Sequence, residues 1–187
     1  MVDLSEYPLH RAAQQDDEEW CRALLAVIDV ETVDARGWTP LHVAAASDNG
    51  NVAMTRKLLQ NKADPNLYIR GVDPPLYHAI AVGSLETVQL LLDSGASVDI
   101  KFNNGWTPMM LAAKEGNHEI GKALQAKGAN LVGKGANDLT PLHIAAMNGS
   151  RVFYKWLTQA GADTSARDDQ QRTAMEVVEG FEVLPQL

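Results

Sequence analysis

The sequence predicts an all-α fold: a solenoid of antiparallel helix pairs linked by hairpin-like loops, with about five repeats and a partial C-terminal capping repeat. The first observation is a Thr-Pro pair that opens an apolar run ending in Ala-Ala. The second is the regular spacing of the prolines that mark this run, which stand at positions 8, 40, 75, 108 and 141. A period of about 33 residues indicates a stacked array in which each unit buries its apolar face against its neighbours.

The motif itself predicts how each first helix begins and packs. Its clearest copies span residues 37–45, 105–113 and 138–146, and each has Thr-Pro at its centre. Threonine caps a helix through its hydroxyl, and proline fits the first turn, where no N–H is needed. Paired alanines leave a thin helix face, so we expect a neighbouring helix to approach closely.

The elements follow in order along the chain. The first unit has helices at about 8–15 and 20–27. The acidic run 16–19 opens the second of these helices. It is interpreted as a solvated cap, or alternatively as a docking patch for a basic partner. The second unit has two extra residues in its turn, at 46–51. A last short motif, 172–179, resembles a first helix with alanine in place of proline, and the tail from Gly180 predicts a cap.

Two units depart from the motif. The third has Pro74 where the second, fourth and fifth have threonine, and the missing cap weakens the helix start by ~1 kcal/mol unless Asp73 replaces it. The fourth keeps Thr107-Pro108 but has Met109-Met110 in place of Leu-His.

These residues resemble the ankyrin repeat, both in Thr-Pro-Leu-His-x-Ala-Ala and in the second half of each unit, as in 88–99 or 156–163. The resemblance covers about residues 4–180 and implies one array. Its units are about 1–34, 35–67, 68–100, 101–133 and 134–166, with a partial cap at 167–187. It also implies a concave face built from loop tips and first helices, which binds another protein.

Composition narrows the function classes. The net charge is −8, with nine acids and two bases in residues 1–34 and twelve bases against nine acids in residues 35–162. Nucleic-acid binders usually carry a concentrated basic face, so no nucleic-acid partner is expected. One cysteine, no visible secretory signal and no run long enough to cross a bilayer predict a monomeric cytoplasmic protein without a membrane partner.

Candidate chemistry is sparse. His10, His42 and His143 share one motif position, and the resemblance implies that each imidazole hydrogen-bonds to the neighbouring turn. Residues 128–135 read GxxxxGK followed by glycine, but a P-loop needs Ser or Thr there, a preceding strand and a following helix. No catalytic, metal or cofactor site is predicted, and the protein is interpreted as a non-enzyme.

The predicted binding surface consists of apolar and basic residues on the loops and at the ends of the first helices. Trp38, Trp106 and Leu139 each precede Thr-Pro or its equivalent and are the proposed anchors, with the alternative that each ring packs on its own loop. The remaining candidates are Arg36, Tyr68, Arg70, Lys101, Phe102, Asn103, Asn104, Lys114, Glu115, Lys134, Met147 and Asn148. The basic loops favour a partner with an acidic surface.

Three other hypotheses remain. The chain could be an inhibitor or immunity-type protein that blocks an enzyme with this surface. It could be a fragment of a larger multidomain protein. It could also be an enzyme that uses the loop at 128–135 on a nucleotide.

Overall fold

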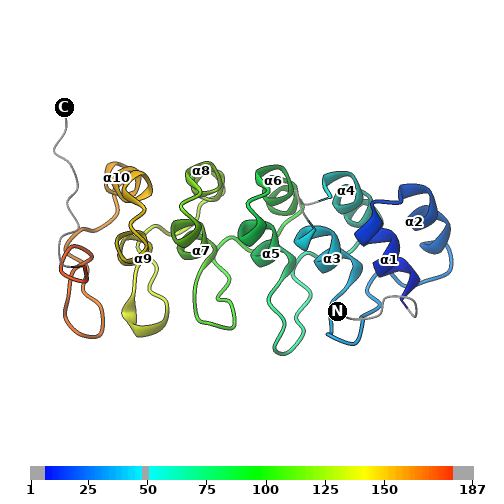
Figure 1. The fold of residues 1–187 in the computed structure, drawn as a ribbon, viewed down its shortest axis with the longest axis horizontal. Coiled ribbons are helices and arrows are strands. Elements are labelled where there is room, and N and C mark those ends of the chain that lie inside the picture. Colours follow the sequence, from blue (N-terminus) through cyan, green and yellow to red (C-terminus); the bar gives the residue numbers. More distant parts are fainter. Residues whose placement is uncertain (1–6, 48–50, 179–187) are drawn as a thin grey trace. The chain divides into compact units, whose positions relative to one another are not determined.

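The computed structural model describes residues 7–47 and 51–178, and the regular elements in these ranges are all helical (Figure 1). The chain divides into two compact units, an N-terminal unit up to Ser97 and a C-terminal unit from Val98 on. The predicted all-α fold class is confirmed, and no β-strand occurs in the described ranges.

The N-terminal unit consists of three helix pairs. They are α1 (Pro8–Gln15) with α2 (Glu18–Leu24), α3 (Pro40–Ala46) with α4 (Val52–Gln60), and α5 (Pro75–Val82) with α6 (Leu85–Asp93). The first helices α1, α3 and α5 pack in one row, and the second helices α2, α4 and α6 form another (Figure 1). The loops between repeats project from the side of the first helices.

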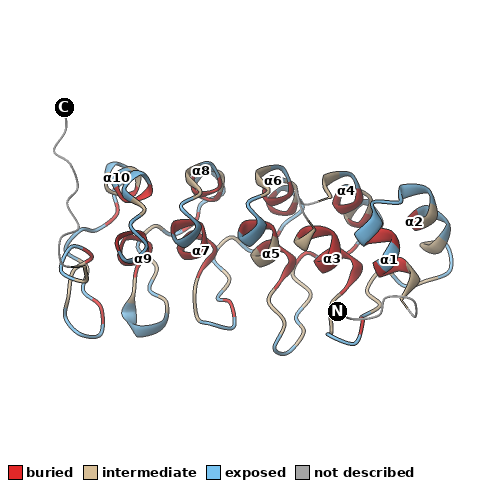
Figure 2. Cartoon of the chain, viewed as in Figure 1, coloured by how far each residue is buried: buried red, intermediate tan, exposed pale blue. Residues whose placement is uncertain are grey.

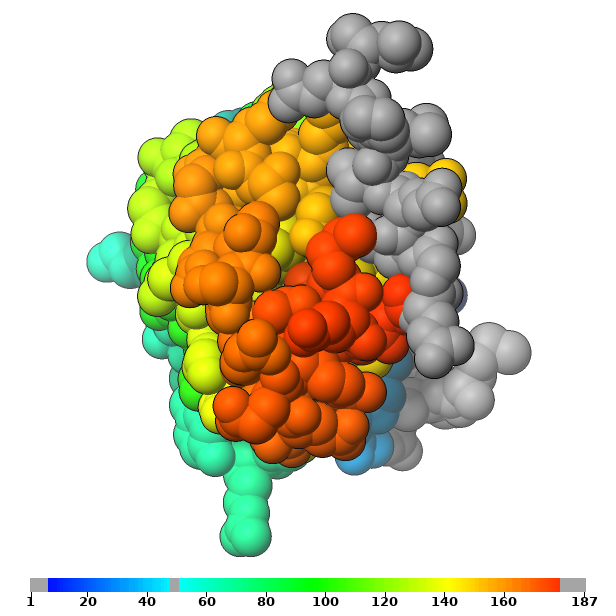
Figure 3. Space-filling model, turned by 90° about the vertical axis from the view of Figure 1, so that its left-hand side faces the viewer, coloured from blue at the N-terminus to red at the C-terminus, as the bar shows by residue number. Residues whose placement is uncertain are grey.

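The C-terminal unit repeats this arrangement with α7 (Pro108–Glu115), α8 (His118–Ala126), the 3₁₀ turn η3 (Ala136–Asp138), α9 (Pro141–Met147) and α10 (Arg151–Gln159). Helix α7 packs on α9, and α8 packs on α10. The segment from about residue 161 to 178, orange to red in Figure 3, covers the end of this unit and buries Ala174.

The prediction of a helix at 172–179 is wrong for its described part, residues 172–178. The chain makes only a turn at 174–176, held by bonds from the Thr173 N–H to the Glu176 carboxylate (2.7 Å) and from the Glu176 N–H to the Thr173 carbonyl (2.9 Å). Without a proline-fixed first turn, so short a run forms too few hydrogen bonds to propagate a helix. Residues 179–187, including the predicted cap, lie outside the described residues.

The helix starts follow the predicted chemistry with two differences. Thr39 and Thr107 accept hydrogen bonds from the backbone N–H groups of His42 and Met110, three residues on. Helix α5 has Pro74 at its N-cap with no side-chain bond, so Asp73 does not occupy the cap position. Helix α2 starts earlier than expected, after Asp17, whose carboxylate accepts the Trp20 N–H at 2.9 Å. The predicted insertion at 46–51 lies partly outside the described residues.

The core lies between the two rows of helices in each unit (Figure 2). The alanine pairs of the motif are almost completely buried in α3, α7 and α9. Their small side chains let neighbouring first helices pack closely, as the sequence predicted.

Candidate functional site

Four of the loops between repeats are closed by the same main-chain hydrogen bond. In each, a residue donates its N–H to the carbonyl four positions later, over 2.8–3.0 Å. The pairs are Asp34 with Trp38, Phe102 with Trp106, Gly135 with Leu139, and Asp168 with Arg172. This shared bond defines a register in which each loop position can be compared with its counterparts.

The motif histidines join each first helix to the following loop. In His143, Nδ1 accepts the Thr140 N–H at 3.3 Å, so the neutral ring carries its hydrogen at Nε2. That Nε2 donates to the carbonyl of Arg172 at 3.0 Å, and His10 donates in the same way to Trp38 at 2.7 Å. The predicted structural role is therefore confirmed for His10 and His143.

In the fourth repeat Met110 stands at the histidine position and keeps one of the two hydrogen bonds, the one from the threonine N–H. The Met110 Sδ accepts the Thr107 N–H at 3.5 Å, as Nδ1 does in histidine. Beyond it, a Cβ on Gly135 would lie 2.7 Å from this sulfur, so glycine leaves the space that the longer side chain fills. Met109 is also fully buried. Neither methionine can contact a partner.

Two loops are braced by buried carboxylates. The fully buried side chain of Asp34 accepts backbone N–H groups of Arg36 (2.8 Å) and Trp38 (3.0 Å), and its other oxygen binds the Arg36 guanidinium at 2.6 Å. Burial by itself would raise the pKa of Asp34, but these hydrogen bonds outweigh it and lower the pKa. Asp168 holds Arg172 in the same way.

Trp38 is half-buried, and its ring is part of a cluster. The Arg36 guanidinium lies over the indole at 4.2 Å from the ring centre, and the His78 ring packs on it at 4.4 Å. His42 and Tyr77 extend the cluster, each within 6.0 Å of His78. Trp38 therefore packs on Arg36 of its own loop and also on His78 of the next first helix, α5.

Trp106 has different surroundings. It is half-buried, and no aromatic ring or cation from the described residues packs on its indole. Its loop is built tightly: Asn104 accepts the Trp106 N–H at 2.9 Å, and a Cβ on Gly105 would lie 3.2 Å from the Cβ of Ala136 in the next loop. The loop of Leu139, also half-buried, thus lies directly beside that of Trp106.

Most other predicted site residues lie on the surface, with Phe102 as the exception. Phe102 is only 4% exposed and packs inside its loop, so its side chain lies outside any contact surface. Met147 is 50% exposed and Tyr68 83% exposed. Also exposed are Arg36, Arg70, Lys101, Asn103, Asn104, Lys114, Glu115, Lys134 and Asn148. Lys114 and Glu115 form an ion pair at 3.2 Å, and the Asn148 amide donates to the Ile144 carbonyl at 2.9 Å.

The loop register reveals residues that sequence reasoning missed. Arg172 occupies the position of Trp38, Trp106 and Leu139, and Arg167 occupies that of Lys101 and Lys134. Asp73 corresponds to the same position as Trp38 by the repeat period, since it stands two residues before Pro75. The signal was present in the sequence, since most of these positions are separated by whole repeat periods. Applying the repeat period to every loop position, and not only to the Thr-Pro motif, would have found them.

The loop at 128–135 lacks the surroundings of a phosphate-binding loop. Helix α8 ends at Ala126 before it, and the 3₁₀ turn Ala136–Asp138 follows it. The Asn130 N–H is already bonded to the Asp99 carboxylate at 2.9 Å. A P-loop needs a preceding strand and a following helix, so the nucleotide hypothesis loses its structural basis.

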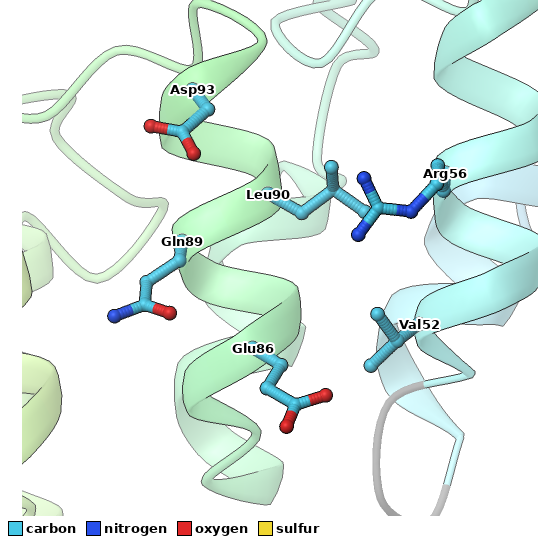
Figure 4. Close-up of a pocket in the computed structure, with 6 residues that line it drawn as sticks. All are labelled: Val52, Arg56, Glu86, Gln89, Leu90 and Asp93. Atoms are coloured by element: carbon cyan, nitrogen blue, oxygen red, sulfur yellow. The ribbon is translucent and has the colours of Figure 1, made fainter.

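A shallow groove of about 210 Å³ lies between α4 and α6, away from the loops (Figure 4). It is lined by Val52, Arg56, Glu86, Gln89, Leu90 and Asp93. The Arg56 side chain reaches across it toward Leu90, so the floor combines a cation, two carboxylates and apolar groups. Among the described residues no group of three or more His, Cys, Asp or Glu side chains is placed to hold a metal ion, here or elsewhere.

The histidine cluster predicts an acid-sensitive N-terminal unit. Burial lowers the pKa of His42 to about 3 and that of His78 to about 4, and their Nε2 atoms lie near the Asp73 backbone without a well-formed hydrogen bond. In the unfolded chain both titrate near 6.5, so below that pH the unfolded state binds protons that the folded state rejects. We expect unfolding free energy to fall by about 2 kcal/mol per histidine between pH 7.5 and 5.

Urea unfolding followed by circular dichroism at pH 7.5, 6.5 and 5 measures this loss. The variant His78→Gln removes one of the two groups and should lose correspondingly less stability on acidification. Equal pH slopes for the variant and the unchanged protein would contradict the assignment.

The helices offer no membrane span: in the part of the chain that the structure describes, none is long and apolar enough to cross a bilayer.

Comparison with known proteins gives partial matches to larger molecules. The chain is 35% identical over 103 residues to human SMC5-SMC6 complex localization factor protein 1, covering 53% of this chain and 10% of that protein. It is 42% identical over 76 residues to human neurogenic locus notch homolog protein 4, covering 40% and 4%. Human ankyrin repeat and SOCS box protein 2 is 55% identical over 51 residues, covering 27% and 8%. The matches span a tenth or less of these relatives.

Family models described as "Ankyrin repeats (3 copies)" match residues 2–69 and 68–134, and the model "Ankyrin repeat" matches residues 137–169. Ankyrin repeats are protein–protein interaction modules and are generally non-enzymatic. These matches cover most of the chain and follow the same repeat period as the helix pairs, so the chain belongs to the ankyrin-repeat family.

Proposed function

We propose that this chain is a non-enzymatic module that binds another protein through the loops and first-helix ends of its repeats. The observation that carries the proposal is the contrast between two tryptophans at the same loop position. Trp38 is held by Arg36 and His78, whereas the half-exposed indole of Trp106 has no such partner among the described residues. An indole left partly in water is a typical interface anchor.

Two further apolar residues of the C-terminal unit support the proposal. Leu139 lies on the adjacent loop, and Met147 is 50% exposed at the end of α9, the first helix that follows that loop. Aromatic residues and methionine are enriched where proteins bind one another. We call the surface formed by Trp106, Leu139 and Met147 the loop edge of the C-terminal unit.

The proposal predicts that Trp106→Ala weakens partner binding while leaving the fold intact. A hot-spot tryptophan contributes about 2 kcal/mol or more, which is a loss of about thirtyfold in affinity. Val152, 71% exposed on the second helix α10, provides the matched control Val152→Ala. The measurement is affinity capture from a native lysate with each variant, quantified by mass spectrometry, followed by calorimetry on the partner that Trp106→Ala loses.

Equal recovery of all captured proteins by the two variants would overturn this placement of the surface. A reduced helical signal in Trp106→Ala would instead show that the indole stabilises its loop.

A further inference from the structure

One loop position carries a cation in every repeat of the C-terminal unit. Lys101, Lys134 and Arg167 each stand immediately before the residue that opens the loop hydrogen bond, they follow one another at the repeat period, and all three are exposed. In the N-terminal unit the same position holds exposed apolar residues, Val33 and Tyr68. The C-terminal unit therefore differs from the N-terminal unit in carrying cations at this loop position. We name these three residues the cation ladder.

The three loops that bear the ladder pack side by side. A Cβ on Gly105 would lie 3.2 Å from Ala136 in the second loop, and the Asp169 N–H in the third loop donates to the Asn137 carbonyl at 3.0 Å. The Lys134 ammonium also bonds the Arg167 carbonyl at 3.2 Å. Since neighbouring helices pack about 8–10 Å apart, successive cations of the ladder are separated by about 10 Å.

Two cations of the ladder form ion pairs with acidic residues of the same chain, and these ion pairs are weak. Lys134 lies 3.6 Å from the Asp138 carboxylate and Arg167 lies 3.2 Å from that of Glu176, with all four side chains about half exposed. Exposed pairs of this kind contribute little to stability, so a carboxylate from a partner can replace them. Lys101 forms no ion pair with a described residue.

We propose that the loop edge of the C-terminal unit binds an extended acidic segment of its partner, with carboxylates three residues apart. In the extended polyproline II conformation a chain rises about 3.1 Å per residue with three residues per turn, so side chains three residues apart point the same way and lie about 9–10 Å apart, close to the distance between successive cations of the ladder. Seven residues therefore place three carboxylates on Lys101, Lys134 and Arg167, while apolar residues between them reach Trp106 and Leu139. This inference rests on the proposed function, because it names the partner of that same surface.

Two synthetic peptides of equal composition test the spacing. The first is a ten-residue peptide with glutamate at positions 2, 5 and 8 and leucine and serine elsewhere, and the second has its three glutamates at 2, 3 and 4. Fluorescence anisotropy of labelled peptides at low salt should show at least tenfold tighter binding of the first. The preference should shrink as salt rises, because exposed charges are screened. Equal affinity for the two peptides, or binding of neither, overturns the inference.

A helical partner is tested in the same assay. A helix rises only about 1.5 Å per residue, so it needs carboxylates about seven residues apart to match the ladder. If a helix-forming peptide with that spacing binds more tightly than the extended peptide, the proposal of an extended segment is overturned.

Charge reversal locates the contact on the chain. Lys101→Glu, Lys134→Glu and Arg167→Glu together should weaken binding of the spaced peptide by at least tenfold. Lys155→Glu, on the second helix α10, is the matched control and should bind normally. Circular dichroism checks that both variants remain folded.

The two proposals fail differently. If Trp106→Ala loses the native partner while the triple charge reversal retains it, the proposed binding surface is supported and the proposal of an acidic segment is wrong. Should both variants retain the partner, the proposed function fails as well.

Discussion

Replacement of Gly121 by leucine is expected to destabilise the C-terminal unit by about 3 kcal/mol. Gly121 lies inside α8, where a Cβ would stand 2.8 Å and 2.9 Å from two ring atoms of Phe153 and 3.0 Å from Trp156. The corresponding helices of the N-terminal unit carry Thr55 and Val88 at this position. Glycine is needed here because α10 supplies a large, fully buried phenylalanine. The gain in helix propensity, about 1 kcal/mol, is smaller than the cost of the clash.

Urea unfolding of the variant measures the loss, and a double-mutant cycle identifies its cause. Shortening the facing ring with Phe153→Val should recover part of the stability in the Gly121→Leu background, so the two changes should be non-additive by about 1 kcal/mol or more. Gln125→Leu, exposed on the same helix, is the control and should change stability by about 0.5 kcal/mol or less. Additive effects of the two core changes would show that ring contact does not explain the glycine.

Asp34→Ala is expected to cost the N-terminal unit about 3 kcal/mol, because it leaves two partly buried backbone N–H groups and the Arg36 guanidinium without their acceptor. The carboxylate accepts the backbone N–H groups of Arg36 and Trp38 and neutralises the Arg36 guanidinium that covers the indole. Asp34→Asn keeps one acceptor oxygen and loses the charge, so about half of this loss is expected. Glu19→Ala, exposed in α2, is the control for removing an acid.

The pH dependence of this difference separates the carboxylate from simple packing. The pKa of Asp34 is lowered in the folded state, so its contribution is present above the unfolded value near 3.9 and is lost as pH falls through the folded value. The stability gap between the unchanged protein and Asp34→Ala should therefore narrow below about pH 4. A gap that stays constant down to pH 3 would assign the loss to packing.

Much of the fold could be predicted from the sequence because its signals are local. Thr39 and Thr107 each cap the helix that the following proline starts, Thr140 stands at the same N-cap position, and the alanine pairs are buried where they were expected. The short motif at 172–179 was misread, since a pattern shared with helices does not supply the packing that a helix needs.

The candidate site was less accessible to sequence reasoning. Trp38 and Trp106 precede the same Thr-Pro pair, yet only the first meets a guanidinium and an imidazole. Phe102 reads as a loop residue and is buried, because its position in the loop register is the one that Asp34 fills with a buried carboxylate. These differences depend on the neighbouring repeat, which a motif does not describe.

The sequence alone therefore determined the repeat, its period, the helix pairs and their caps, since each depends on residues within a few positions of one another. Tertiary structure decided which side chains remain available to a partner. Burial, the bracing of Arg36 and Arg172 by Asp34 and Asp168, and the alignment of Lys101, Lys134 and Arg167 arise only when successive repeats within a unit lie side by side.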